Sequence, residues 1–119
     1  MTKLDHLGFV VSDLERSLAF YQKLFGFEEV KRFKFRANDI VLMDIGDGLL
    51  ELIQREGDAV PPAGCHTALL EPDFDKRVEV LKEMGVEARL SEGLNGDKLC
   101  FFKDPDGHTI ELTELGLGS

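Results

Sequence analysis

Two histidine–glutamate pairs recur along this chain at one fixed spacing. His6 precedes Glu51 by 45 residues and His66 precedes Glu111 by the same 45, so that the second pair is the first shifted by 60. Such a mixed set of imidazole nitrogens and carboxylate oxygens suits Ni²⁺, Co²⁺, Zn²⁺, Mn²⁺ or Fe²⁺. A single histidine or glutamate on a strand more often serves another role. Four of them in a repeat-related pattern predict one metal site.

The hydrophobic periodicity around these residues predicts the same order of elements in each half, strand–helix–strand–strand–strand. In the first half, a helix over 13–25 is capped by Asp13 and closed by Gly26. The predicted strands of this half cover residues 4–11, 27–35, 39–45 and 49–54. In the second half, the helix starts at Pro72-Asp73 and ends at Gly85. Its predicted strands cover 66–70, 86–90, 98–102 and 109–115, with a turn at 104–107 before the last.

Alternation along the strands predicts where the four side chains point. Each glutamate is flanked by apolar neighbours that face the other way, and those neighbours are expected to pack on the helix. A buried carboxylate without a partner is costly, and a bound cation shared by both pairs would remove that cost. His108 directly follows residues 104–107 and is interpreted as a solvated residue of that turn.

The chain is expected to form a single domain over residues 1–119. Module one covers 1–55, a linker covers 56–63, and module two covers 64–119. The fold class is α+β.

Composition narrows the possible partners. The net charge is −9, and such an acidic surface repels phosphate backbones, so no nucleic-acid partner is expected. No apolar run approaches the length of a membrane span, so no membrane partner is expected. Cys65 and Cys100 are predicted to be half-buried reduced thiols, and a cytoplasmic location is expected.

Two stretches carry a family resemblance. The segment LDHLGFVVSDLERSLAFYQKLFGF at 4–27 and the segment KDPDGHTIEL at 103–112 resemble the vicinal-oxygen-chelate superfamily. Its members include glyoxalase I, bleomycin-resistance proteins and extradiol dioxygenases. The resemblance implies two tandem βαβββ modules that form a curved sheet around a metal cavity. It also implies a divalent ion that chelates two neighbouring oxygens of a small-molecule substrate.

Within the superfamily, the ligand set His6, Glu51, His66 and Glu111 is similar to that of bacterial glyoxalase I. This similarity implies a lyase of the lactoylglutathione lyase type that works through an enediolate. The related thiol transferases and extradiol dioxygenases use two histidines and one glutamate. Glyoxalase I commonly has arginine and asparagine where this chain has Val10 and Arg55, so the thiol partner stays open.

The resemblance assigns proton transfer to Glu111, and Glu51 is the symmetric candidate. The alternatives are another enzyme of the superfamily, whether epimerase, thiol transferase or dioxygenase, and a resistance protein that binds a small molecule. Relatives pair their modules within one chain or between two chains, so a homodimer is expected.

Overall fold

The computed structural model describes residues 1, 4–55, 65–93 and 96–116. Contacts divide the chain into two compact units, Met1–Val60 and Pro61–Ser119, and each is described by itself. The linker predicted over 56–63 lies outside the described residues.

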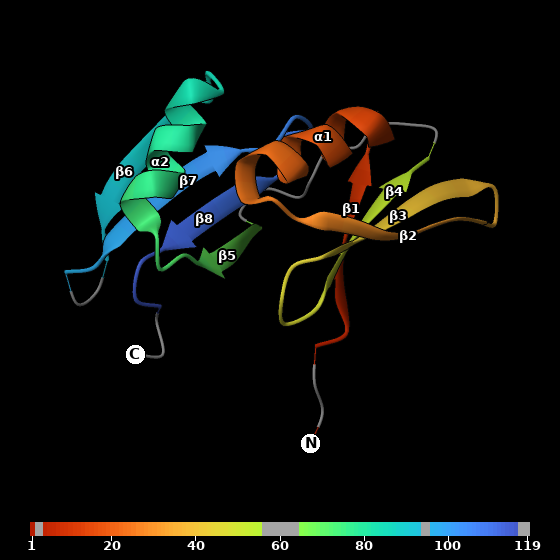
Figure 1. Cartoon of the computed structure of the whole chain (residues 1–119), viewed down its shortest axis with the longest axis horizontal. Helices are drawn as coiled ribbons and strands as arrows, with labels where there is room; N and C mark the ends of the chain where they lie inside the picture. The colour runs from red at the N-terminus through yellow and green to blue at the C-terminus, as the bar shows by residue number, and fades with distance from the viewer. Residues whose placement is uncertain (2–3, 56–64, 94–95, 117–119) are drawn as a thin grey trace. The chain divides into compact units, whose positions relative to one another are not determined.

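The first unit has one helix and a four-stranded sheet (Figure 1). In chain order its elements are β1 (His6–Val11), α1 (Leu14–Phe25), β2 (Glu28–Phe35), β3 (Asn38–Asp44) and β4 (Leu49–Gln54). The strand order across the sheet is β1-β4-β3-β2, in which β1 and β4 are parallel and the other pairs antiparallel.

The second unit repeats this topology. Its elements are β5 (His66–Leu70), α2 (Phe74–Glu83), β6 (Ala88–Glu92), β7 (Lys98–Lys103) and β8 (Thr109–Thr113). The strand order is β5-β8-β7-β6, again with a parallel pair, β5 and β8, at one edge. The α+β class and the tandem βαβββ modules are therefore confirmed.

The first helix follows directly from its sequence signals. The Asp13 side chain accepts a hydrogen bond from the Arg16 N–H, which satisfies an otherwise unpaired group of the first turn. Gly26 takes the left-handed conformation, with φ of 74°, and its N–H donates to the Gln22 carbonyl. In α2, Asp73 precedes the helix without making a side-chain cap.

Each sheet buries the face that was predicted to pack on the helix. In the first unit, this face is apolar, and its buried residues are Phe9, Val11, Val41, Met43, Leu50 and Leu52. In the second unit, the equivalent buried residues are Cys100, Phe102, Ile110 and Leu112. The opposite face of each sheet carries one histidine–glutamate pair.

Two predicted boundaries need correction. The strand predicted over 86–90 is β6, which lies two residues later and has hardly any buried side chain to mark it. The strand predicted over 39–45 is β3, which begins one residue earlier at Asn38 and leaves only Arg36 and Ala37 in the turn before it. Both turn residues have positive φ, 51° and 68°, without the glycine that usually signals such a turn.

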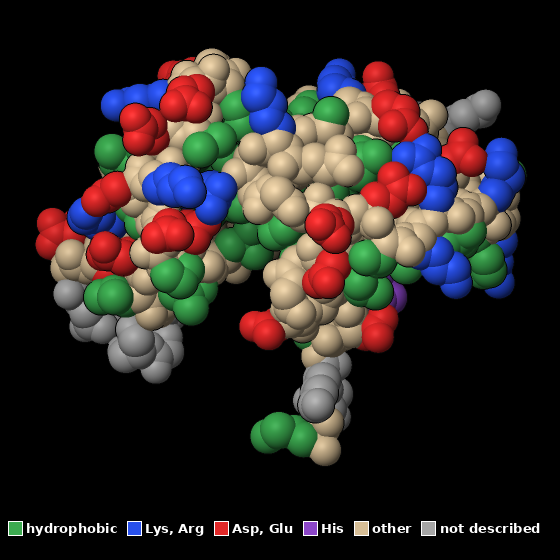
Figure 2. Space-filling view, viewed as in Figure 1, with side chains coloured by type: hydrophobic (Ala, Val, Ile, Leu, Met, Phe, Trp, Pro, Cys, Tyr) green, Lys and Arg blue, Asp and Glu red, His purple; other side chains and the backbone are tan. Residues whose placement is uncertain are grey.

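On the surface that Figure 2 shows, acidic and basic side chains are intermixed over both units, with apolar side chains between them. Within the described part of the chain, no helix is both long and apolar enough to cross a membrane.

Candidate metal centre

The first histidine–glutamate pair is positioned by the parallel strands β1 and β4. His6 is the first residue of β1, and the strand register sets Gly8 opposite Glu51. Because residues two apart on a strand share a face, His6 and Glu51 lie diagonally adjacent on one face. The His6 Nε2 atom is 3.7 Å from Glu51 Oε1.

The second pair has the same register. His66 is the first residue of β5, and Ala68 lies opposite Glu111 on β8. The His66 Nε2 atom is 3.5 Å from Glu111 Oε1. The internal repeat inferred from spacing thus corresponds to a repeated arrangement of side chains within each unit.

Both distances suit two ligands of one metal ion. At 3.5 and 3.7 Å the contacts are too long for good hydrogen bonds. Metal–ligand bonds of about 2.0–2.2 Å at right or tetrahedral angles would place two ligand atoms roughly 2.8–3.6 Å apart. The two atoms of each pair would therefore approach by about 1 Å or less to hold an ion.

The two glutamates are shielded, whereas the histidines are accessible. The Glu111 side chain is 11% exposed and that of Glu51 is 19% exposed, whereas the His66 side chain is 49% exposed. Burial without a strong partner is unfavourable for a carboxylate, and a cation would relieve it. Among the described residues, no group of three or more metal-binding side chains comes together. The structure thus shows two pairs, and their union in one site is a proposal.

Asp5 orients His6, a role that the sequence analysis did not single out. His6 Nδ1 donates a hydrogen bond to Asp5 Oδ2 at 2.7 Å, which leaves Nε2 on the side of Glu51. This hydrogen bond is the main reason that the pKa of His6 is raised. Desolvation lowers the pKa by less than the hydrogen bond raises it, and the charge of Glu51 adds to the rise. A carboxylate behind a ligand histidine typically fixes the ring and its tautomer. The sequence signal for this role of Asp5 was its position directly before His6.

Gly8 provides room for Glu51. A Cβ atom at this position would lie 3.0 Å from Glu51 Oε1, closer than side-chain contacts normally allow. The equivalent residue of the second unit, Ala68, already carries a methyl group beside Glu111. The two pairs therefore differ in the space around their carboxylates.

Other candidate residues lie apart from the pairs. Arg55 is exposed just after β4. His108 is partly exposed directly after the turn, and its backbone N–H donates to Asp104 Oδ1, which also accepts from the Asp106 N–H. The cysteines are both free, but neither is half-buried as predicted: Cys65 is exposed, and burial raises the pKa of the fully buried Cys100 thiol.

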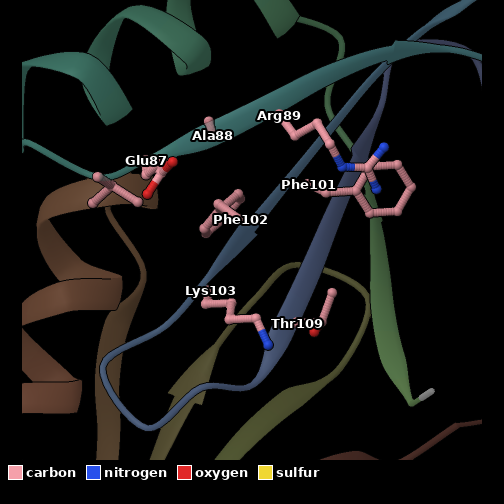
Figure 3. A pocket seen from close by; sticks show the side chains of 8 residues that line it. Glu87, Ala88, Arg89, Phe101, Phe102, Lys103 and Thr109 are labelled. Carbon is pink, nitrogen blue, oxygen red and sulfur yellow. The ribbon is translucent and has the colours of Figure 1, made fainter. Parts of the chain in front are cut away.

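A cavity of about 760 Å³ lies beside β6, β7 and β8 of the second unit (Figure 3). Arg89 and Phe101 line it, and the guanidinium carbon of Arg89 is 4.7 Å from the centre of the Phe101 ring. Sequence reasoning missed both residues, because only the pairing of β6 with β7 brings them together.

The fold, the repeated pairs and the sequence all agree with one family. Residues 3–112 match the Glyoxalase/Bleomycin resistance protein/Dioxygenase superfamily. The chain belongs to this superfamily, as its terminal motifs implied.

Relatives with different activities resemble the chain to a similar degree. It is 32% identical to metallothiol transferase FosB of Lysinibacillus sphaericus, over 92% of this chain and 79% of that protein. It is 28% identical to lactoylglutathione lyase GLX1 of Arabidopsis thaliana, over 93% of this chain but only 44% of that longer protein.

The same fold is found in a solved structure of the fosfomycin resistance protein FosX from Listeria monocytogenes. The TM-score is 0.82 at 24% identity, over 99% of this chain and 96% of that one. That crystal contains Mn(II) and 1S,2S-dihydroxypropylphosphonic acid. This likeness concerns the fold.

Proposed function

We propose that the chain is a metal-dependent lyase of the glyoxalase I type. It would isomerise a small substrate with two vicinal oxygens through an enediolate. The observation that supports this most is the equivalence of the two pairs, His6–Glu51 and His66–Glu111, in register and in distance. Two histidines and two glutamates match the ligand set that glyoxalase I enzymes use.

The proposed cofactor is one divalent ion, Ni²⁺, Co²⁺, Zn²⁺, Mn²⁺ or Fe²⁺, held by all four residues. These metals are proposed because neutral imidazoles and ionised carboxylates are ligands that bind them well. When bound, such an ion would act as a Lewis acid that stabilises negative charge developing on the two substrate oxygens. Asp5 supports the site by fixing the ring of His6.

Proton transfer falls to the glutamates. Isomerisation requires a base that removes a proton from the carbon beside one oxygen and returns it to the neighbouring carbon. Glu111 is the proposed base, since the family resemblance assigns proton transfer to it and its side chain is the more buried of the two. Glu51, whose carboxylate occupies the space left free by Gly8, is the proposed second carboxylate ligand.

A second candidate is a thiol transferase, because FosB is 32% identical to this chain. The two candidates differ at one residue. A transferase of this family needs two histidines and one glutamate, which His6, His66 and Glu111 already supply. Glu51 is required only by the four-ligand lyase.

The test measures two reactions in wild type and in Glu51→Gln, with Glu79→Gln on the exposed face of α2 as the matched control. One assay supplies methylglyoxal with glutathione or another small thiol, and the other supplies fosfomycin with the same thiols. The lyase proposal predicts thioester formation that falls about 100-fold or more in Glu51→Gln and is unchanged in Glu79→Gln. Consumption of fosfomycin that survives Glu51→Gln would instead establish the transferase.

A further inference from the structure

Part of the cavity beside β6, β7 and β8 lies on the sheet face that carries the second histidine–glutamate pair, whereas Ala88 and Phe102 line it from the helix-packing side. Strand register defines two neighbouring rows across this face. One row runs from His66 through Thr109 to Lys103. Thr109 and Lys103 both line the cavity. The pair therefore shares a face with the part of the cavity that Thr109 and Lys103 line.

The other row links the proposed base to the stacked arginine. Ala68 lies opposite Glu111, Glu111 opposite Phe101, and Phe101 opposite Arg89. Arg89 thus has its backbone two strands away from Glu111, while its guanidinium lies over the ring of the intervening Phe101 (Figure 3). Each residue of the pair therefore lies in a row of paired strand residues that ends at a cation, Lys103 for His66 and Arg89 for Glu111.

The ring of Phe101 holds the guanidinium in a defined place. A stacked guanidinium keeps its N–H edge available for a bidentate contact with an oxyanion. Because the ring already restricts the arginine, less side-chain entropy is lost when a ligand binds. The half-buried ring also offers an apolar surface to the rest of such a ligand.

The two cations are not neutralised by the described residues around them. Within these residues, no carboxylate lies within 4.0 Å of the Arg89 or Lys103 nitrogens. Glu87 also lines the cavity and offsets part of their charge, so the cavity lining carries a net charge of about +1. Both side chains are exposed, so in a chain with a net charge of −9 they give this cavity a local positive charge that favours an anion.

The first unit lacks the equivalent arrangement. There the row that starts at His6 passes through Leu49 and reaches Asp44, an acidic residue where the second unit has Lys103. The row through Glu51 passes through Leu42 to Lys31, with no aromatic ring between the glutamate and the cation. Among the described residues, only the second unit has a cation at the end of both rows.

We propose that Arg89, supported by Phe101 and Lys103, binds an oxyanion of the substrate, a carboxylate, phosphonate or phosphate. This inference rests on the proposed function and adds a substrate class to it, namely small anionic compounds with two vicinal oxygens. Adjacent strands are about 4.8 Å apart, so the anion would lie roughly 5–10 Å from Glu111. That span fits a compact molecule that reaches both groups at once.

The test titrates three probes into the full-length, metal-depleted protein by calorimetry. Phenylphosphonate and benzoate each combine an aromatic body with an oxyanion, and they distinguish a phosphonate from a carboxylate preference. Benzyl alcohol has a similar body without the charge. The variants are Arg89→Gln and Arg89→Lys, and the control is Lys76→Gln on the exposed surface of α2. Circular dichroism checks that each variant folds.

Wild type and Lys76→Gln are expected to bind at least one oxyanion probe more tightly than benzyl alcohol. Arg89→Gln should bind it at least tenfold more weakly, and Arg89→Lys, which keeps the charge but loses the planar fork, at least threefold more weakly. Equal affinity in wild type and both variants, or no oxyanion binding by wild type, overturns the inference.

The proposed function is judged separately. The metal content of Arg89→Gln should equal that of wild type, because Arg89 is not a proposed ligand. Anion binding through Arg89 in a protein without metal or turnover would leave the inference standing and refute the lyase. Intact metal binding and turnover, with no effect of the Arg89 variants on anion binding, would support the lyase and refute the inference about Arg89.

Discussion

Glu111 is buried and has the imidazole of His66 as its neighbour. It lies on β8, an inner strand of its sheet, on the face where part of the cavity also lies. Such a carboxylate is suited to proton transfer, because its side chain is only 11% exposed and lies beside the proposed ion site. Its counterpart Glu51 is less buried, and its carboxylate lies beside Gly8, where Glu111 has Ala68. The two glutamates are equivalent in the repeat but not in their surroundings.

The base role of Glu111 predicts a specific kinetic defect. In Glu111→Gln, saturated with metal, exchange of the substrate proton with solvent deuterium should fall about 10²–10⁴-fold relative to wild type. The glutamine keeps the shape of the side chain but cannot accept the proton. Proton NMR of the substrate in D₂O measures the exchange. Equal exchange rates in the two proteins would remove Glu111 as the base and leave Glu51.

The tight space at Gly8 predicts an asymmetry between the two pairs. Gly8→Ala should push the Glu51 carboxylate from its position, because the added methyl would lie 3.0 Å from Oε1. Metal affinity is expected to fall about tenfold or more, because changes next to a metal ligand typically cost about 10–100-fold. The control is Ala68→Gly, the equivalent position of the second unit, which removes a methyl and should leave affinity close to wild type. Competition against a chromogenic chelator measures both, and an unchanged Gly8→Ala would contradict the argument.

At the scale of elements, the sequence predicted the order of all ten helices and strands in the described residues, and most boundaries to within two residues. Amphipathic patterns, the Asp13 cap and the αL glycines Gly26 and Gly85 carried this success. The weak points were β6, whose side chains are largely exposed, and the Arg36-Ala37 turn, which uses left-handed residues without glycine. The residues of β6 and of this turn therefore lack the buried apolar pattern or the glycine that would have predicted them.

The histidine–glutamate pairs were foreseen because a repeat makes them visible in one dimension. The Arg89–Phe101 stack was not, since it depends on the register between β6 and β7. That register is set by which backbone groups pair across two strands, and neither spacing nor alternation determines it.

The end of β8 is secured by a buried hydrogen bond. Thr113 Oγ1 donates to Asp97 Oδ2 at 3.0 Å and accepts from the Gly116 N–H, and both Thr113 and Asp97 are buried. Thr113→Val should lower the free energy of unfolding by about 1–3 kcal/mol, because the buried carboxylate loses its donor. Urea denaturation measures this, with Thr67→Val on β5 as the control, since it changes the same atoms at a half-buried position. Equal stability of the two variants would show that the Thr113–Asp97 bond is dispensable.

At the scale of the whole molecule, each unit contributes only two ligands, so two units must combine to complete the proposed four. We expect a homodimer, which static light scattering would report at twice the 13.3 kDa chain mass. A monomer at micromolar concentration would refute this expectation.

Mixing two inactive variants, His6→Ala and His66→Ala, distinguishes pairing within one chain from pairing between chains. If the ligands come from two chains, a mixed dimer contains one intact set of four, and part of the activity returns. If they come from one chain, every set stays defective and the mixture remains inactive.

The central claim, one divalent ion held by four residues, is tested most directly by metal content. Wild type, the alanine variants of His6, Glu51, His66 and Glu111, and the control His108→Ala are dialysed against limiting Mn²⁺, Co²⁺, Ni²⁺ or Zn²⁺ and analysed by inductively coupled plasma mass spectrometry. The account predicts about one ion per four-residue set in wild type and in His108→Ala, and a strong loss in each of the four ligand variants. Wild-type metal content in all four variants would contradict it.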